Sequence, residues 1–547
     1  MAAASSSIAG SPDPPIPRST DSPITRSPDH PITRWIDPAL LLILLFGIVL
    51  RSQYLGLPMA EAHRWREITN ADIARNFYER SMNIFYPQVN WGGAVDPYVG
   101  MEFPLMHWIA ALLYWVVGEH AVIGRLVSMA FSIGTVWATY ALGARLFGRP
   151  AGRAAAFLIA VSPSAVFFGR FFISDTPMVF YSVAAVLAWV IYFDTGSRRA
   201  CIAGAVCSAL AFLVKIPAVL ILVPIAWAAW EARRWAVLKD RGFLAGITSA
   251  VAATGLWYWH ADAIFHRTGL SQAIWHPSGN YGPPISLAAG PFIGIYHWAT
   301  PARLQDPAFY SDMTTRIWAL HLTPAGFVLA LFALLAMWRV PRRRLVDVWI
   351  AIVIVFILAT TEGHIHHEFH QLPMLPPAAL LFGLAAAPAF DGGWLRTRGG
   401  RITGPLGSAV VLGAVALLSF KFSGVVPNFF RPDRLDMVPI DAGRAIQAAT
   451  DPSALIVTVE YEEYSNNSPI QLYWAHRRGW SFDPKSITPQ VLELLRKDFG
   501  ARYFVTTIWR HLSANRPDVA HYLQNWRQVP LPGGPRDTVM FDLSQPR

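Results

Sequence analysis

Residues 65–77 have the sequence WREITNADIARNF and follow the first apolar run of the chain. Thr69-x-x-Asp72 is the pattern of a capping box, so it predicts a helix that opens there. Arg66 and Glu67 then lie at a helix N-terminus, where backbone N–H groups and the helix dipole favour anions. An acid beside such a corner suits chemistry on a lipid phosphate at a membrane surface. The alternative is a charged interfacial loop with an ordinary helix cap.

The composition predicts a polytopic membrane protein. Of 547 residues, 53% are hydrophobic and only 15% are charged, whereas soluble domains have about 25% charged residues. Many apolar runs approach the length of a membrane-spanning helix. The net charge is +10, but the arginines lie in short loops between apolar runs, which is the positive-inside pattern and does not imply a nucleic-acid partner. The two cysteines, Cys201 and Cys207, share one apolar run, so no disulfide framework or zinc site is expected.

Charge decides which apolar runs cross the membrane. The run 104–118 is short for a span, and if it crossed, the arginines of every later loop would change sides. We therefore expect it to lie flat in the outer interface, within a large first outer loop at 58–120. Eleven spans remain, with the N-terminus cytoplasmic and the C-terminus outside: 38–57, 121–146, 153–169, 176–194, 200–213, 216–231, 243–260, 321–338, 345–361, 372–389 and 404–422.

The chain divides into three parts. Residues 1–37 are rich in Pro, Ser, Asp and Arg and are predicted to be a disordered cytoplasmic tail. The transmembrane domain is placed at 38–424. From 425 to 547 the composition becomes polar, and an extracytoplasmic α/β domain is predicted from strands at 455–459 and 503–507 with a helix at 487–499.

Polar residues collect on the predicted outer face, and charges at a membrane rim are functional candidates by default. They are Glu61, His63, Arg66, Glu67, Asp72, Arg75, Glu102, Arg170, Asp175, Lys215, Glu362, His364, His366, His367, Glu368 and His370.

Simpler explanations of these residues stay open. Asp72, Arg75 and Glu79 stand at helical spacing and would pair with one another. Lys215 would merely extend its ammonium group to the interface, and Asp175 would only start a helix. The four histidines share no regular face, which is weak evidence for a metal, so we expect rim residues facing a wet cavity.

The arrangement resembles the GT-C superfamily of membrane glycosyltransferases, which take a sugar from a polyprenyl-phosphate carrier. Relatives include protein O-mannosyltransferases, aminoarabinose transferases acting on lipid A and the oligosaccharyltransferase catalytic subunit. The resemblance covers about 58–390 and rests on these motifs: WREITNADIARNF at 65–77, MEFPL at 101–105, SP at 162–163 with Arg170 and SD at 174–175, LVKIP at 213–217, and HQLPMLPP at 370–377. It implies an α-helical polytopic membrane protein of GT-C fold with a small C-terminal α/β extracytoplasmic domain. Relatives usually carry an Asp or an Asp-Glu pair in the first outer loop, where this chain has Arg66-Glu67.

The resemblance also implies roles, since transfer from a lipid phosphate to a hydroxyl needs a base and positive charge for the leaving phosphate. The implied catalytic residues are Glu67, Asp175 and Glu102, with Glu67 preferred as base. Arg66, Lys215 and Arg170 would bind the donor phosphate. The cavity would further include His63, Asp72, Arg75, His367 and His370. A divalent cation, Mg or Mn, would bridge acids and phosphate in some relatives, and its presence here stays open. The loop 261–320, with Trp275, Tyr281, Tyr296 and Trp298, would close over the site.

The predicted function is transfer of a sugar, with inversion, from a polyprenyl-phosphate-linked donor to a glycan, lipid or protein acceptor. The reaction would take place on the outer face of a membrane, by resemblance the bacterial inner membrane. Two other classes stay open. A secondary transporter would have related halves and acids near the bilayer midplane, and a noncatalytic envelope-assembly protein would keep the fold and lose the acids.

Overall fold

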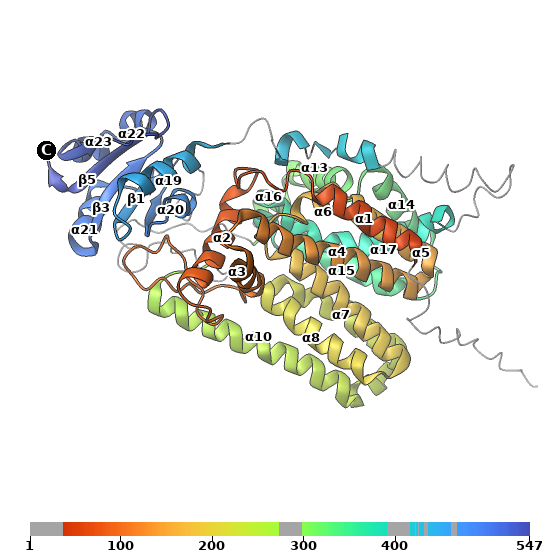
Figure 1. Cartoon of the computed structure of the whole chain (residues 1–547). Coiled ribbons are helices and arrows are strands. Elements are labelled where there is room, and N and C mark those ends of the chain that lie inside the picture. Colours follow the sequence, from red (N-terminus) through yellow and green to blue (C-terminus); the bar gives the residue numbers. More distant parts are fainter. Residues whose placement is uncertain are drawn as a thin grey trace, which may run out of the picture. The chain divides into compact units, whose positions relative to one another are not determined.

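The computed structural model describes most of the chain, chiefly as helices (Figure 1). The described residues are 37–272, 298–390, 416–421, 423–424, 426–430, 436–460 and 468–547. The predicted tail lies almost wholly outside them, as do most of the span at 404–422 and the lid residues Trp275, Tyr281 and Tyr296. The predicted fold class, a helical membrane protein with a small α/β domain, is confirmed.

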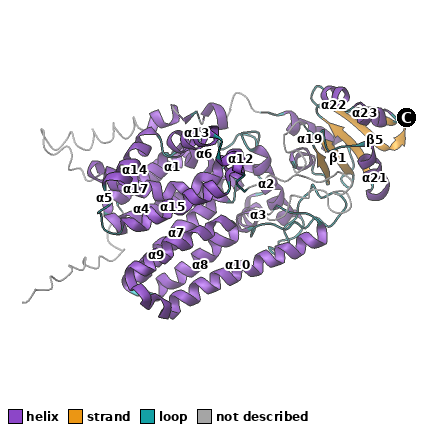
Figure 2. Ribbon diagram, turned by 180° about the vertical axis from the view of Figure 1, so that it is seen from behind, coloured by secondary structure: helices purple, strands orange, loops and turns teal. Residues whose placement is uncertain are grey.

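The helical part extends to η5 Val426–Phe430, and Figure 2 distinguishes it from the strands by colour. Its α-helices are α1 Pro38–Arg51, α2 Arg64–Glu79, α3 Leu105–Val117, α4 Ala121–Phe147, α5 Arg149–Val161, α6 Pro163–Phe168, α7 Asp175–Thr195, α8 Arg198–Val214, α9 Leu222–Arg233, α10 Arg241–Thr268, α12 Pro301–Leu304, α13 Pro307–Thr315, α14 Pro324–Ala336, α15 Arg343–Ala359, α16 Thr361–His366 and α17 Leu375–Phe390. Shorter helical segments are η1 Ile216–Ile221, η2 Arg234–Lys239, η3 Arg316–His321 and η4 Glu368–Met374.

Several described helices are long and apolar enough to cross a membrane, which supports an integral membrane protein. By length and composition they are Ala121–Phe147, Asp175–Thr195, Ile216–Lys239 and Glu368–Phe390. The bent pair Pro307–His321 and Pro324–Ala336 provides one more if it counts as a single span. The predicted number of eleven spans is not confirmed.

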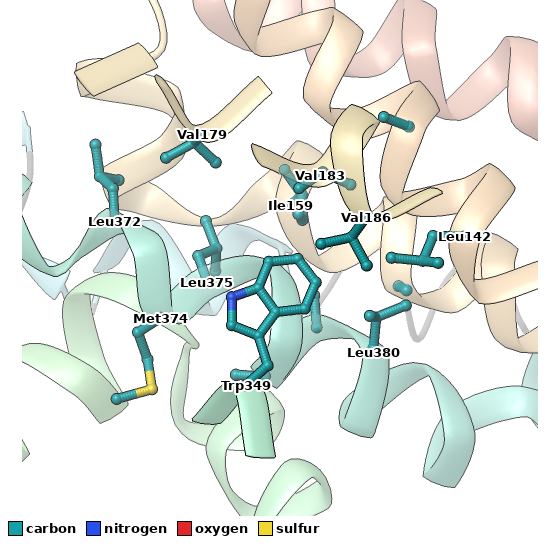
Figure 3. Packing of buried hydrophobic residues seen from close by; sticks show 14 of the residues in the cluster. Leu142, Ile159, Val179, Val183, Val186, Trp349, Leu372, Met374, Leu375 and Leu380 are labelled. Carbon is teal, nitrogen blue, oxygen red and sulfur yellow. The ribbon is translucent and has the colours of Figure 1, made fainter. Parts of the chain in front are cut away.

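Small residues let the central helices pack closely. A Cβ on Gly383 of α17 would lie 2.4 Å from the carbonyl oxygen of Ala151 of α5, and one on Gly143 of α4 would lie 3.0 Å from the Cα of Gly152. Such contacts are typical of helices that associate within membranes. Around them lies one large buried apolar cluster, part of which surrounds Trp349 of α15 (Figure 3).

The helix that carries Arg66 and Glu67 begins earlier than predicted. α2 starts at Arg64, so the predicted capping box at Thr69-x-x-Asp72 is wrong: Thr69 Oγ1 donates to the Trp65 carbonyl inside the helix, at 2.7 Å. The preceding residue, His63, is in the left-handed conformation with φ 59° and provides no side-chain cap. Arg66 and Glu67 nevertheless lie at the N-terminal end of α2, as predicted.

The run 104–118 forms a short helix. α3 has 13 residues, a length of about 20 Å, which is less than the thickness of a bilayer core; its interfacial placement stays a prediction. The predicted loop 261–320 contains more regular structure than expected, because α10 continues to Thr268 and the described part of 301–321 is helical.

The C-terminal domain is built on a five-stranded sheet of order β2-β1-β3-β5-β4. β2 and β3 run parallel to β1, whereas β5 is antiparallel to both β3 and β4. The strands are β1 Leu455–Val459, β2 Gly479–Phe482, β3 Ala501–Thr506, β4 Trp526–Val529 and β5 Val539–Pro546, and the helices are α19 Val438–Ala449, α20 Ile470–Ala475, α21 Pro489–Phe499, α22 Trp509–Asn515 and α23 Pro517–Gln524. The predictions of β1, β3 and α21 are confirmed, and β2, β4 and β5 were not predicted.

The loop that follows α2 pairs with the edge strand β2. Gly479 N–H donates to the Asn90 carbonyl at 3.0 Å, and Gly93 N–H donates to the Gly479 carbonyl at 2.7 Å. Gly93 has φ 61°, and a Cβ there would lie 1.9 Å from Cε2 of Trp480, so only glycine fits. These bonds cover an otherwise unpaired sheet edge and connect the C-terminal domain to the loop that contains α2.

Candidate active site

A buried ion-pair network fixes the segment that leads into α2. Arg125 of α4 donates from Nε and Nη2 to both carboxylate oxygens of Glu67, at 2.8 and 2.9 Å. Its Nη1 donates to the carbonyl oxygens of Leu55 and Leu57, at 2.9 and 2.6 Å. A single guanidinium on α4 thus holds residues 55–67 in place. Both Glu67 oxygens accept from this guanidinium, and the Glu67 side chain is only 1% exposed, so the carboxylate is closed off from solvent.

Glu61 extends this network to the segment between α6 and α7. It accepts from Arg125 Nη2 at 3.3 Å and from Arg170 Nη2 at 2.5 Å. The side chains of Glu61, Glu67, Arg125 and Arg170 are at most 1% exposed. Two carboxylates and two guanidinium groups balance one another, which burial requires. Arg170, a predicted phosphate ligand, is therefore engaged by an acid here.

Four other predicted site residues form a second group, Arg66, Glu102, Asp175 and Lys215, here named the four-residue site. Lys215 Nζ donates to Asp175 Oδ2 at 2.5 Å, and Asp175 Oδ1 is buried without a hydrogen-bond partner in the described part of the chain. The charge of Glu102 interacts with those of Lys215, Arg66 and Asp175. Two acids and two cations from separate parts of the sequence therefore lie together.

The environment of Glu102 suits proton transfer. Burial raises the pKa of its carboxyl group, while the positive charges of Lys215 and Arg66 act in the opposite direction. A general base works best when its pKa lies near the working pH. Glu102 is partly exposed at the surface of the chain.

Backbone hydrogen bonds hold Glu102 from both sides. The residues before and after it bind three other segments: Gly100 N–H to Leu270 O at 3.0 Å, Gln272 N–H to Gly100 O at 2.9 Å, Trp257 Nε1 to Met101 O at 3.0 Å, and Phe103 N–H to Leu213 O at 2.9 Å. The last bond joins Phe103, the residue after Glu102, to Leu213 near the end of α8, two residues before Lys215. Glu102 and Lys215 are thus positioned by a shared piece of backbone.

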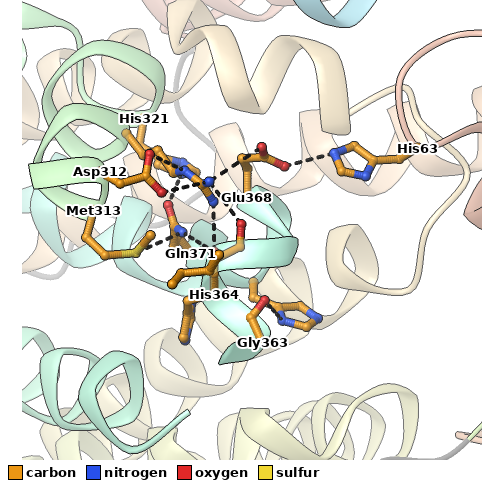
Figure 4. A network of polar contacts seen from close by, with 11 residues as sticks. His63, Asp312, Met313, His321, Gly363, His364, Glu368 and Gln371 are labelled. Carbon is orange, nitrogen blue, oxygen red and sulfur yellow. Dashed lines mark hydrogen bonds and ion pairs between the residues drawn. The ribbon is translucent and has the colours of Figure 1, made fainter. Parts of the chain in front are cut away.

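The histidine-rich segment borders this region. His63 Nε2 donates to Glu368 Oε2 at 2.8 Å, and Arg316 lies 3.9 Å from the same carboxylate (Figure 4). His367 stacks on Phe369 with ring centroids 5.0 Å apart, and Lys215 Nζ lies 5.4 Å from the centre of the Phe369 ring.

His370 donates from Nδ1 to the Gly363 carbonyl at 3.1 Å. Within the described ranges, no three His, Cys, Asp or Glu side chains are placed to hold a metal. The rings of His63, His367 and Phe369 contact one another and form an aromatic edge beside Lys215 of the four-residue site.

Asp72 and Arg75 lie farther along α2: Asp72 binds the loop that pairs with β2, and Arg75 contacts the C-terminal domain. Asp72 accepts from the N–H and the side-chain amide of Asn90, at 2.9 and 2.6 Å. Arg75 donates to Glu119 at 2.8 Å and to the Tyr473 carbonyl at 2.5 Å, and its guanidinium lies 3.6 Å from the centre of the Tyr473 ring. These two predicted cavity residues are not brought to the four-residue site.

The sequence did not single out Arg125, the hub of the buried network. The signal was available, because an arginine one turn into the apolar run 121–146 is costly without acidic partners. Its partner Glu61 was among the polar residues noted at the outer face.

Comparisons with known proteins agree with this architecture. The family model of dolichyl-phosphate-mannose-protein mannosyltransferases matches residues 101–259, a segment that contains Glu102, Asp175 and Lys215. No curated protein sequence matches the chain.

Several solved structures have a similar fold. ArnT from Cupriavidus metallidurans in the apo state has a TM-score of 0.61 at 14% identity, over 92% of this chain and 97% of that chain. The same protein bound to undecaprenyl phosphate has a TM-score of 0.59 at 13% identity, over 92% and 98%. The archaeal oligosaccharyltransferase AglB from Archaeoglobus fulgidus, in complex with an inhibitory peptide and a dolichol-phosphate, has a TM-score of 0.54 at 13% identity, over 90% and 72%.

The arabinofuranosyltransferase AftD from Mycobacteria is also similar, with a TM-score of 0.52 at 14% identity, over 93% of this chain and 42% of that chain. At such identities the likeness concerns the fold. The chain thus has the fold of the GT-C membrane glycosyltransferases, the superfamily that its sequence resembles.

Proposed function

We propose that the chain is an integral-membrane glycosyltransferase that moves a sugar from a polyprenyl-phosphate carrier to a hydroxyl of a glycan, lipid or protein acceptor. The observation that carries this proposal is the convergence of Arg66, Glu102, Asp175 and Lys215. The matched family model is that of mannosyltransferases named for a dolichyl-phosphate donor, and two similar structures are named with bound undecaprenyl phosphate and dolichol-phosphate.

In the proposed reaction, Glu102 is the base. It removes the proton of the acceptor hydroxyl, whose oxygen attacks the anomeric carbon as the bond to the phosphate oxygen breaks. Arg66 and Lys215 hold the phosphate and stabilise the charge that develops on it. Asp175 keeps Lys215 oriented through the 2.5 Å bond. A single displacement of this kind inverts the anomeric centre.

Glu67, the base preferred from the sequence, has a different role in this proposal. Both of its oxygens accept from Arg125, and its side chain is buried. We therefore propose that Glu67 anchors the first turn of α2, and that it presents Arg66 to the site. Arg170 has the corresponding anchoring role on the other side of Glu61.

Donor binding tests the proposal. The purified protein in lipid nanodiscs should bind a synthetic polyprenyl phosphate, and Lys215→Met or Arg66→Met should weaken binding by about 10- to 100-fold, the loss expected for one charge-assisted phosphate contact. The matched control is Lys239→Met, because Lys239 lies in η2 outside the site. Equal affinities for all three variants and the wild type would contradict the assignment.

We further propose that the site faces the outside of a bacterial inner membrane, with the N-terminus cytoplasmic. This orientation is supported by the distribution of arginines along the sequence, which follows the positive-inside pattern. Reporter fusions after residues 120 and 425 should report the outer compartment, and a fusion after residue 148 the cytoplasm. A cytoplasmic signal from the fusion after residue 425 would contradict the proposed orientation.

A further inference from the structure

Each carboxylate of the four-residue site has a cation beside it. Asp175 is bonded to Lys215 at 2.5 Å, and Glu102 interacts with both Lys215 and Arg66. Arg66 forms no ion pair in the described part of the chain, and its buried Nε has no hydrogen-bond partner there. Its guanidinium lies 4.2 Å from the centre of the Trp65 ring. Within the described residues, Arg66 is thus a cation with no carboxylate partner and with an unused Nε donor.

A divalent cation does not fit this donor set. Mg²⁺ and Mn²⁺ are hard ions that require several oxygen ligands in a near-octahedral arrangement. The site offers the oxygens of Glu102 and Asp175, and one Asp175 oxygen is already bonded to an ammonium group. No trio of metal-ligating side chains exists among the described residues. A divalent ion between these carboxylates would also lie next to two positive side chains, which repel it.

We infer that Arg66 and Lys215 together take the place of a divalent cation, so that sugar transfer at this site is independent of metal ions. This inference rests on the proposed function. The donor phosphodiester carries one negative charge. When its bond to the sugar breaks, the electron pair stays on the phosphate oxygen, and the phosphate leaves with two negative charges. The acceptor proton moves to Glu102 in the same step, so the charges balance. The negative charge gained by the phosphate is met by the Nζ donors of Lys215 that Asp175 does not use and by the N–H groups of Arg66.

Manganese binding tests this inference separately from transfer. Mn²⁺ is titrated into the full-length protein in nanodiscs, with and without polyprenyl phosphate, and free Mn²⁺ is followed by electron paramagnetic resonance. We expect the wild type to have no saturable Mn²⁺ site that depends on Asp175. Arg66→Glu places a third carboxylate beside Glu102 and Asp175 and should create such a site. Stoichiometric Mn²⁺ binding by the wild type, lost in Asp175→Asn, would overturn the inference.

Transfer provides the second measurement. With a synthetic polyprenyl-phosphate sugar, exhaustive removal of divalent ions by chelator should change the wild-type rate less than twofold, and Mn²⁺ should not restore the rate lost in Arg66→Ala. A rate that collapses with chelator and returns with Mn²⁺ would refute metal independence while leaving the transferase proposal intact. If the wild type transfers no sugar from any donor, the proposed function fails, and the Mn²⁺ titration alone then decides whether the site rejects a divalent ion.

Discussion

Replacing Arg125 by methionine should destabilise the protein severely, because the side chain is buried and its donors serve four groups. The change leaves the carboxylates of Glu67 and Glu61 without their common partner and frees the carbonyls of Leu55 and Leu57. Removing one member of a buried ion pair costs about 3–5 kcal/mol, because the other charge stays buried. Methionine preserves most of the side-chain volume, so packing changes contribute little.

Pulse proteolysis of the detergent-solubilised protein across a denaturant series measures this cost. The matched control is Arg145→Met on the same helix, since Arg145 pairs with Asp194 at a partly exposed position and should cost at most about 1 kcal/mol. In the double variant Arg125→Met with Glu67→Gln, the total should be smaller than the sum of the single changes, because no full charge remains at residue 67. Equal costs for Arg125→Met and Arg145→Met, or strict additivity with Glu67→Gln, would refute the anchoring role.

Three further changes test the connection between α2 and the C-terminal domain. Burial raises the pKa of Asp72 from 3.8 to about 6, so the contribution of Asp72 to stability is most favourable below about pH 4 and is lost as the pH rises through 6. The free energy of unfolding should therefore fall by up to about 3 kcal/mol over this range. Asp72→Asn should flatten this dependence on pH, and an unchanged dependence would contradict the assignment. Gly93→Ala should loosen the pairing with β2, because a Cβ would lie 1.9 Å from Trp480 Cε2, and limited proteolysis should then release the C-terminal domain faster than in the wild type. Tyr473→Phe removes only the 3.1 Å hydrogen bond to Glu119 and should cost about 0.5–1.5 kcal/mol in the same unfolding assay; a loss several times larger would mean that the hydroxyl has another role.

The sequence predicted those features that depend on local periodicity. Long apolar runs became helices with ends close to those predicted, as in α4 and α7. The strands β1 and β3 were recognisable because they are largely apolar runs in the parallel part of the sheet. β4 was not recognisable, since Trp526–Val529 is short and half polar, and its partner β5 identifies it only in three dimensions.

The sites depend on contacts between distant segments, which one sequence does not show. Asp72, Arg75 and Glu79 stand at pairing distance along a helix, yet Asp72 binds Asn90 and Arg75 binds Glu119. The acid at the position matched to relatives, Glu67, was preferred as base because its motif was visible. Its partner Arg125, 58 residues later, was not considered.

The start of α2 was misplaced for a local reason. Thr69 is a common N-cap residue, but its hydroxyl bonds back to Trp65 within a helix that already began at Arg64. The actual N-cap, His63, provides none of the side-chain bonds by which a helix start is recognised. The convergence of Arg66, Glu102, Asp175 and Lys215 was anticipated only through the predicted topology, which placed all four on one face.

Sugar transfer by Glu102→Gln tests the central claim most directly. Single-turnover transfer from a synthetic polyprenyl-phosphate sugar is measured for the purified wild type and variant, together with donor affinity. The proposed base role predicts a loss of about 100-fold or more in transfer, with donor affinity within about twofold of the wild type. Glu79→Gln, at an exposed position of α2, should transfer normally. Near-normal transfer by folded Glu102→Gln would contradict the account.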